Sequence, residues 1–505
     1  MSTPVAKRPY LVFAAITLVL VLLVVLSPHQ SVDPDSVFGF RALQGWKVTG
    51  QFNQVIIPDA ADISRFQSFF LTWWSPGQYL FPYFIQQTLH LSLGQSITLL
   101  NFIAILGGLV GFYKLFRFYQ LPEKVVTLSL LLILCSHTVL FRFILYQGGE
   151  TCSFLFFPWL VYFFVNIRRP ILQACIAVVL IIAGFIAKSQ MLIALIPLFL
   201  LAPLLSTPIN VSTAIDRRRS IKRRAANVLP VGLAILAALW LLQVFFLSKG
   251  VNPSTTARFN PSLLDTFIPL ASPINAISNG WSLFHRIGER HPLAEIAALV
   301  IFTCFVFLVF IKAGLQAYYT RLVFYYYIAC CLIFIFLYYY DAHIDYDVRH
   351  HKFIAYLFFP ILVKWLSATL SYRKVAIGIT VLGLYALANQ YRLTRIWEKD
   401  AYVTTGDLLL STTDLPQDLY RALSLKKNEG LTLFFSRFPA EWAVDRWDIV
   451  FADSRAYKVC PGHKYPVWYV RKETPGWEQE MQTAFPAYSI ASSRRIGDYI
   501  IVCLQ

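Results

Sequence analysis

Two carboxylates stand one residue apart soon after the first apolar run of the chain, in the segment SVDPDSVFGF at 31–40. Pro34 lies between Asp33 and Asp35 and predicts an extended segment, in which the two side chains need not point the same way. A carboxylate in this place can accept a proton from a hydroxyl or amine nucleophile, or it can bind a divalent cation. Solvated loop charge is the alternative interpretation.

A second group of residues could bind a phosphate. Lys188 interrupts an apolar hairpin, where a buried charge is costly and usually has a partner. The alternative is that its side chain snorkels to the membrane surface. The other basic candidates lie in polar segments between apolar runs, where solvated charge is again the alternative: Arg258, His285, Arg286, Arg290, Arg349, His350, His351 and Lys352.

A third carboxylate, Glu150, lies in the short segment YQGGET and could face Asp35 across a site, although a plain turn residue is the alternative. The segment DAHIDYD at 341–347 has the composition of a metal site, but its spacing matches no known cage. A magnesium or manganese ion held by Asp33 or Asp35 is therefore left open as a hypothesis. The chain has no P-loop and no Gly-rich dinucleotide turn, so direct use of ATP or a nucleotide sugar is not expected.

The composition places these residues in a membrane protein. The chain has 505 residues, 57% of them hydrophobic and only 14% charged, with a mean hydropathy of +0.57. Soluble domains carry roughly a quarter charged residues. The net charge of +17 comes partly from basic clusters between apolar runs, such as DRRRSIKRR at 216–224, which are typical of cytoplasmic loops. No aromatic and basic recognition module accompanies them, so nucleic acid is not an expected partner.

Runs long enough to cross a bilayer, about 20 apolar residues each, predict eleven spans. The first is read as a retained span, because it is long for a signal peptide and lacks a small-x-small cleavage pattern. Every second loop is basic, which predicts a cytoplasmic N-terminus and a C-terminal tail on the opposite side. The predicted spans are 10–27, 97–116, 124–143, 152–167, 170–187, 190–205, 228–248, 293–312, 322–340, 353–370 and 375–391.

Two polar regions fall on the predicted outer side. Loop 28–96 contains SRFQSFFLTWWSPGQYLFPYF, which we interpret as one or two helices at the membrane surface with Trp73 and Trp74 at headgroup level. The tail 392–505 contains three strand-like stretches, LTLFFSR, PVWYVRK and DYIIVCL, and one helical stretch, GWEQEMQTAF. We predict a membrane domain over 1–391 and a small α/β domain over 392–505. In that tail, Cys460 and Cys503 could form a disulfide if the surroundings are oxidising.

Several of these stretches together resemble glycosyltransferases of the GT-C superfamily, which includes protein O-mannosyltransferases and the lipid A aminoarabinose transferase. The shared features are an early Asp in the first outer loop, the aromatic-x-PG-x-x-L element WSPGQYL, and the strand-helix-strand ending. AGFIAKSQMLIALIPLFLLA at 183–202 resembles paired helices that turn at a Thr-Lys-Gly-like element, occupied here by Ala187, Lys188 and Ser189. The chain departs from the family by having Asp-Pro-Asp instead of Asp-Glu, which leaves open which aspartate is the base.

The resemblance implies an all-α polytopic GT-C-like domain and an enzyme of the bacterial inner membrane. Such an enzyme moves a sugar from a polyprenyl-phosphate donor to an extracytoplasmic glycan, lipid or protein, and direct displacement would invert the anomeric centre. We favour Asp35 over Asp33 as base, because Asp35 directly precedes the helical pattern SVFGFRAL. The alternatives are a flippase or other carrier for lipid-linked glycans, and a ligase or polymerase of surface polysaccharide.

Overall fold

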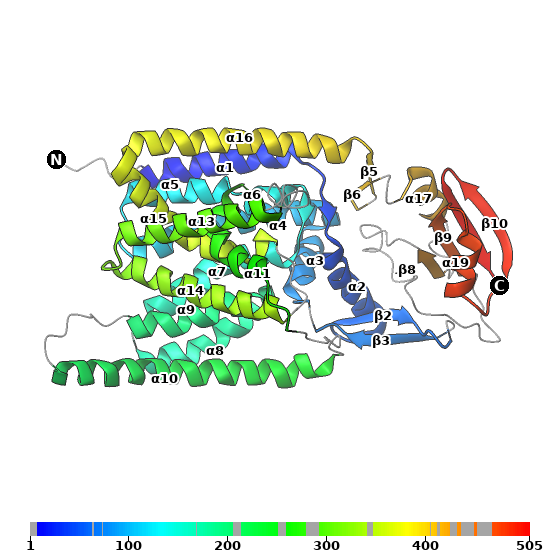
Figure 1. The fold of residues 1–505 in the computed structure, drawn as a ribbon. Helices are drawn as coiled ribbons and strands as arrows, with labels where there is room; N and C mark the ends of the chain where they lie inside the picture. Colours follow the sequence, from blue (N-terminus) through cyan, green and yellow to red (C-terminus); the bar gives the residue numbers. More distant parts are fainter. Residues whose placement is uncertain are drawn as a thin grey trace.

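The protein is described here by a computed structural model. It describes residues 8–62, 65–72, 74–167, 169–205, 214–250, 259–278, 292–340, 347–404, 406–411, 415–424, 432–435, 449–451 and 467–505. Most of these residues are helical, and Figure 1 shows long helices running side by side, with the C-terminal strands beyond one end of them.

The long apolar runs of the sequence form a helical bundle. The helices are α1 (Arg8–Leu26), α4 (Leu93–Phe118), α5 (Glu123–Leu134), α6 (His137–Leu140), α7 (Gly149–Asn166), α8 (Pro170–Ala187), α9 (Met191–Leu205), α10 (Ala214–Phe245), α11 (Leu263–Ser278), α13 (Pro292–Ala313), α14 (Tyr318–Tyr339), α15 (Lys352–Leu370) and α16 (Tyr372–Glu398). Three short 3₁₀ turns connect them: η2 (Phe141–Phe143), η3 (Leu247–Lys249) and η4 (Val348–His350).

Each of the eleven predicted spans coincides with helix in the structure. Fewer of these helices, within the part of the chain that the structure describes, are long and apolar enough to be counted as membrane spans. Among the described residues, six helices are long and apolar enough to cross a membrane, or seven if the bent pair 123–134 and 137–143 is one span. Of the other predicted spans, 190–205 falls on the shorter apolar helix α9, and 152–167 and 375–391 fall on the less apolar helices α7 and α16. Two helices extend well beyond their predicted spans, since α10 already includes the basic cluster 216–224 and α16 continues to Glu398, and the helix α11 was not predicted.

Close packing between the helices relies on small residues at the contacts. A Cβ on Gly108 of α4 would lie 2.5 Å from the ring of Phe154 of α7, so a larger residue there would push the two helices apart. In α11, Pro269 and Pro273 interrupt the backbone ladder because proline has no N–H. Carbonyls in this part of α11 accept hydrogen bonds from α14 instead, at Pro269 from the Cys331 thiol and at Leu270 from the Tyr327 hydroxyl.

The predicted outer loop 28–96 contains strands as well as helices. Its elements are β1 (Ser31–Val32), α2 (Pro34–Thr49), β2 (Gln54–Pro58), β3 (Phe66–Phe70) and α3 (Gly77–Leu89). Of the one or two helices predicted for the stretch around the SPG break, the structure has one, because Phe66–Phe70 before the break is a strand that pairs antiparallel with the β-branched stretch Gln54–Pro58. Helix does follow the break, as α3. Trp73 lies outside the described residues.

The C-terminal part forms a five-stranded sheet with the order β10-β11-β9-β7-β8. Its strands are β7 (Thr432–Phe435), β8 (Ile449–Phe451), β9 (Val467–Lys472), β10 (Ile490–Ile496) and β11 (Tyr499–Leu504), with helix α19 (Trp477–Ala484). Strands β7, β8 and β9 are parallel, whereas β9, β11 and β10 are antiparallel. The three predicted strands and the predicted helix occur here as β7, β9, β11 and α19. Cys460 lies outside the described residues, so its disulfide with Cys503 stays a prediction.

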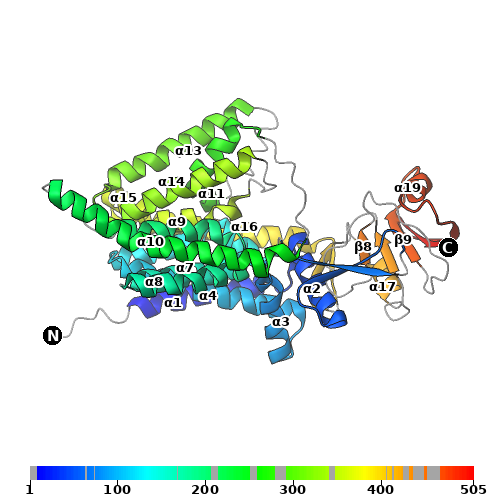
Figure 2. The same ribbon diagram turned by 90° about the horizontal axis from the view of Figure 1, so that it is seen from below.

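A second apolar core joins this C-terminal part to the loop 28–96. It includes Phe40 of α2, Tyr79 of α3, and Leu408 and Leu410 around the hairpin β5 (Ala401–Val403) and β6 (Leu409–Ser411). Helix α17 (Gln417–Ser424) contributes Leu419 to the same core. Figure 2 shows α2 and α3 at the same end of the bundle as the C-terminal strands. We call this the site end, because the candidate residues gather there.

Candidate active site

A short parallel strand pair joins the two segments that carry the candidate carboxylates. Strand β1 pairs with β4 (Leu145–Tyr146), which lies four residues before Glu150 in the sequence. The Asp33 N–H donates to the Tyr146 carbonyl at 3.0 Å, and the Ser36 hydroxyl donates to the same carbonyl at 3.4 Å. The aspartate segment and the start of α7 are therefore held together by backbone contacts.

Asp33 is extended, as Pro34 predicts for the residue before it, but a helix begins at Pro34 and places Asp35 in its first turn. Asp33 is the N-cap of α2 and its Oδ1 accepts the Asp35 N–H at 3.0 Å, while Pro34 takes the first helical position. Proline is well suited to that position, since its missing N–H would have no helical partner there and its φ is already helical. The correction matters for the chemistry, because one oxygen of Asp33 is already committed to the cap.

Three carboxylates surround the guanidinium of Arg349. Its Nη1 lies 3.5 Å from Asp33 Oδ2, its Nη2 lies 3.4 Å from Asp35 Oδ2, and its Nε lies 3.3 Å from Asp347 Oδ2. The side chains of Asp35 and Asp347 are 42% and 43% exposed, whereas those of Asp33 and Arg349 are 13% and 15% exposed. Asp35 is therefore the more accessible member of the predicted pair.

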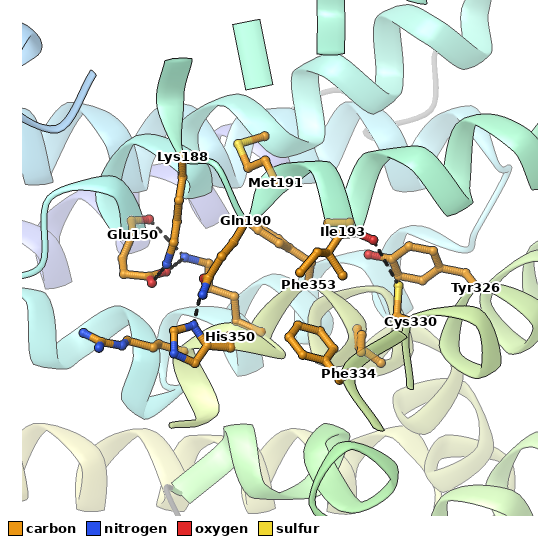
Figure 3. A pocket seen from close by; sticks show the side chains of 14 residues that line it. Glu150, Lys188, Gln190, Met191, Ile193, Tyr326, Cys330, Phe334, His350 and Phe353 are labelled. Carbon is orange, nitrogen blue, oxygen red and sulfur yellow. Dashed lines mark hydrogen bonds and ion pairs between the residues drawn. The ribbon is translucent and has the colours of Figure 1, made fainter. Parts of the chain in front are cut away.

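A second ionic cluster lies deeper, where Glu150 pairs with two lysines. Lys188 Nζ contacts Glu150 Oε1, and Lys352 Nζ contacts Glu150 Oε2, so that each carboxylate oxygen has its own ammonium group (Figure 3). Lys352 also donates to the Glu150 carbonyl at 3.2 Å and to the Ser153 hydroxyl at 2.8 Å. The side chains are 3% exposed for Glu150, 1% for Lys352 and 16% for Lys188.

The two histidines that precede α15 have different environments. His350 Nδ1 lies 2.7 Å from Gln190 Oε1, beside the lysine cluster. Burial, and then the charges of Lys188 and Arg349, lower the pKa of His350 well below its usual value, so we expect a neutral ring. His351 points elsewhere: its Nε2 lies 2.9 Å from the Tyr338 hydroxyl, and burial lowers its pKa to about 3. His350 therefore belongs to the site, and His351 belongs to the packed interior.

A buried polar network fixes the start of α7, and with it Glu150. Asn101 donates to Gln30 Oε1 at 2.8 Å and to the Arg142 carbonyl at 3.0 Å, and its Oδ1 accepts the Thr151 hydroxyl at 2.7 Å. Buried polar groups of this kind hold a unique arrangement when each member has its partner. The network therefore sets the position of the residue next to Glu150.

Glycines allow Lys188 to reach this carboxylate. Gly148 has a φ of +47°, which lets the chain turn into α7. A Cβ on Gly149 would lie 3.1 Å from Lys188 Cγ. A Cβ on Gly77 would lie 2.6 Å from the Ile186 carbonyl, so the WSPG motif brings α3 directly against the end of α8. Lys188 follows one residue after α8 ends, in the turn that the sequence predicted.

A narrow cavity adjoins both clusters. It is lined by Glu150, Lys188, Gln190, Arg349, His350 and Lys352, together with apolar residues of α9, α14 and α15. The open space within it amounts to about 10 Å³, which is about what one water molecule requires. Arg349 is shared by the cavity and the aspartate cluster, so the two clusters form one continuous site.

The structure thus brings together seven of the predicted candidates: Asp33, Asp35, Glu150, Lys188, Arg349, His350 and Lys352. His351 lies in the packed interior instead. Glu150 lies in the first turn of a helix and pairs with lysines, unlike the loop position facing Asp35 that was predicted. The other four predicted phosphate ligands lie outside the described residues: Arg258, His285, Arg286 and Arg290. In the described part, no group of three or more His, Cys, Asp or Glu side chains has the geometry of a metal site.

Arg142 was missed, although a signal for it was present. It lies inside a predicted span, where an ionisable residue is itself a functional signal. Its side chain is fully buried, its guanidinium carbon lies 5.0 Å from the Phe154 ring centroid, and it interacts with the Tyr356 hydroxyl, but no ion pair with a carboxylate occurs within the described ranges. Gln190 and Ser153 were also missed, since a single polar residue beside an apolar run carries no distinguishing pattern.

No protein-family model and no curated protein matches this chain. Among solved structures, the chain is similar to a crystal structure of ArnT from Cupriavidus metallidurans bound to undecaprenyl phosphate. The TM-score is 0.49 at 11% sequence identity, over 99% of this chain and 98% of that one. It is also similar to the apo state of ArnT from the same organism, with a TM-score of 0.45, 11% identity and the same shares of each chain.

Proposed function

We propose that this protein is an integral-membrane glycosyltransferase that moves a sugar from a polyprenyl-phosphate donor to an extracytoplasmic acceptor. The observation that carries the proposal is the placing of an accessible carboxylate beside a buried group of cations at one end of an apolar helical bundle. These are the two kinds of group that the reaction requires: a base for the acceptor and positive charge for the departing phosphate.

Asp35 is the proposed base. One of its oxygens faces Arg349, and its side chain is the more exposed of the aspartate pair. Asp33 is better suited to a positioning role, because its Oδ1 caps α2 and its Oδ2 faces Arg349. Arg349 would hold both carboxylates in place through these contacts.

Lys188 is the proposed principal ligand of the donor phosphate, with Arg349 and His350 beside it. An ammonium group is a common phosphate ligand, and Lys188 is the more exposed of the two lysines that contact Glu150. A neutral His350 would act as a hydrogen-bonding group without adding charge. When the acceptor oxygen attacks the anomeric carbon, the bond to the phosphate oxygen breaks, Asp35 takes the acceptor proton, and the anomeric centre inverts.

The placement of charge favours an enzyme over a carrier for lipid-linked glycans. A carrier would need charged or polar groups along a path through the bundle. Here the ionic residues of the site gather at the end that bears α2 and the C-terminal part. In the proposed topology this end faces away from the cytoplasm, the N-terminus is cytoplasmic, and residues beyond α16 cover the outer side. A divalent ion at Asp33 or Asp35 stays a hypothesis, since Arg349 already balances part of their charge.

The proposal is tested with membranes that contain the protein and radiolabelled polyprenyl-phosphate sugars. Transfer of label from the organic phase to an acceptor, dependent on the protein and lost in Asp35→Asn, is the expected result. If the label stays on the lipid with every donor while intact lipid-linked sugar moves between leaflets, the protein is a carrier and not a glycosyltransferase.

A further inference from the structure

Glu150 has an arrangement that does not suit a catalytic acid or base. Its carboxylate is 3% exposed, and each of its oxygens already faces an ammonium group. A general base must reach the proton that it removes, and neither oxygen of Glu150 is turned toward open solvent. Its position instead fits a counter-ion that two lysines share.

The two lysines differ in how firmly they are held. Lys352 Nζ has three acceptors, the Glu150 carboxylate, the Glu150 carbonyl and the Ser153 hydroxyl, which is the full capacity of an ammonium group. Lys188 Nζ has one contact among the described residues, with Glu150 Oε1, and its side chain is 16% exposed. Lys188 can therefore leave the carboxylate at a much smaller cost than Lys352 can.

Glu150 is shared by two ammonium groups, so neither lysine has a carboxylate to itself. A third cation, Arg142, is buried nearby without an ion-pair carboxylate in the described ranges. The other three carboxylates of the site contact Arg349 and not the lysines: Asp33, Asp35 and Asp347. A phosphate anion that reaches Lys188 would therefore meet a cation that holds only one oxygen of a shared carboxylate.

There is no room for that anion while Glu150 stays where it is. The open space of about 10 Å³ beside the cluster suits about one water molecule, and a phosphate group is several times larger. A carboxylate bridging two ammonium groups through separate oxygens also has the charge and the hydrogen-bonding pattern of a phosphate. Phosphate and Glu150 would therefore compete for the same lysine.

Building on the proposed function, we infer that Glu150 is an internal stand-in for the donor phosphate. In the empty protein it holds Lys188 through Oε1, and when a lipid phosphate arrives, Lys188 exchanges this oxygen for a phosphate oxygen. Lys352 stays bound to Glu150 throughout, through Oε2 and the Glu150 carbonyl. The exchange keeps Lys188 ordered between turnovers, and it weakens the binding of the phosphate product, which must leave before the next donor enters.

The inference predicts that replacing Glu150 with a neutral residue increases the affinity of the protein for polyprenyl phosphate. Glu150→Gln removes the competing charge, so polyprenyl phosphate should bind roughly tenfold more tightly, which is about 1.4 kcal/mol. If Glu150 merely orients Lys188, the same substitution weakens binding. The matched control is Glu123→Gln, which removes a carboxylate paired with Arg117 where α4 ends and α5 begins. It should leave the affinity unchanged.

The experiment is a titration of purified protein in lipid nanodiscs with polyprenyl phosphate, for the wild type, Glu150→Gln, Lys188→Gln and the double variant. The expected pattern is tighter binding in Glu150→Gln, weak binding in Lys188→Gln, and binding in the double variant that is much weaker than in Glu150→Gln, because the exchange requires Lys188. Equal or weaker binding in Glu150→Gln overturns the inference and leaves the proposed function intact. Absence of binding in both the wild type and Glu150→Gln overturns both.

Glu150→Gln could unfold the protein, since it leaves two lysines without their carboxylate. Glu150→Gln combined with Lys352→Met removes both members of the buried ion pair. Replacing such a pair as a whole often leaves folding stability unchanged or raises it. This variant leaves Lys188 as the free cation, and it should bind polyprenyl phosphate at least as tightly as the wild type. A folded double variant that has lost the affinity would contradict the exchange.

Discussion

Replacing each aspartate of the pair by asparagine separates a base from a positioning residue. If Asp35 removes the acceptor proton, Asp35→Asn should lower kcat/KM by roughly 10²–10⁴-fold, the usual contribution of a general base. This corresponds to about 3–5 kcal/mol of transition-state stabilisation. Folding should be little affected, since Asp35 is 42% exposed and Arg349 keeps its contacts with Asp33 and Asp347.

Asp33→Asn is the matched control, because it makes the same chemical change two residues away. Asparagine caps a helix about as well as aspartate, so the hydrogen bond from the Asp35 N–H to residue 33 should survive. We expect kcat/KM to stay within roughly tenfold of the wild type, since the lost charge interacts with Arg349 and not with the acceptor. Asp33→Ala should in addition lower stability by about 1 kcal/mol through loss of the cap.

The assay is transfer of a labelled sugar by purified protein in nanodiscs, with kcat/KM measured for the acceptor at saturating donor. Thermal unfolding of each variant shows whether it is folded. If the Asp35→Asn protein keeps most of its activity, Asp35 is not the general base. An Asp33→Asn protein that loses as much as Asp35→Asn would show that the two carboxylates act as one unit.

Three further substitutions test the elements that position the site. Lys188→Ala should raise the KM for the donor roughly tenfold or more, with little change in the KM for the acceptor; an unchanged donor KM would favour the snorkelling interpretation. Gly149→Ala places a Cβ 3.1 Å from Lys188 Cγ and should also raise the donor KM, whereas Gly378→Ala, with open space around its Cβ, should leave activity unchanged. Asn101→Ala leaves Gln30 and Thr151 without their partner and should lower stability by about 1–3 kcal/mol, measured by thermal unfolding.

The sequence was most informative where a charge interrupts an apolar run. Lys188 was identified in this way, and the structure places it at a helix end with an acidic partner, as the cost of burying a charge requires. Arg142 carried the same signal within a predicted span and was overlooked. Helices were predicted well because a run of apolar residues in a membrane protein has few alternatives to helix. Phe66–Phe70 shows the limit, since its strand depends on pairing with Gln54–Pro58.

The site itself could be predicted only as a set of residues and not as an arrangement. Pro34 favours an extended residue before it and also a helix that starts with it, and the structure shows both, with Asp33 extended and Asp35 in the first turn of α2. The pairing of Glu150 with Lys352 joins residues about two hundred positions apart, and no local pattern encodes such a contact. Loop charge and site charge look alike in sequence, which is why Arg349 could not be separated from its neighbours in advance.

For the proposed transfer, the exposure of each charged group separates an acceptor side from a donor side. The side chains of Asp35 and Asp347 are nearly half exposed, those of Arg349 and Lys188 are exposed to about the same small extent, and those of Glu150 and Lys352 are almost fully buried. An inverting displacement requires the base and the leaving group on opposite faces of the sugar. Under the proposed function, a phosphate at Lys188 and an acceptor at Asp35 would meet this requirement, because Arg349 lies beside both groups and the sugar would lie between them. The proposal then has the lipid enter from the bundle and the acceptor from the exposed side, so that the two substrates need not share a path.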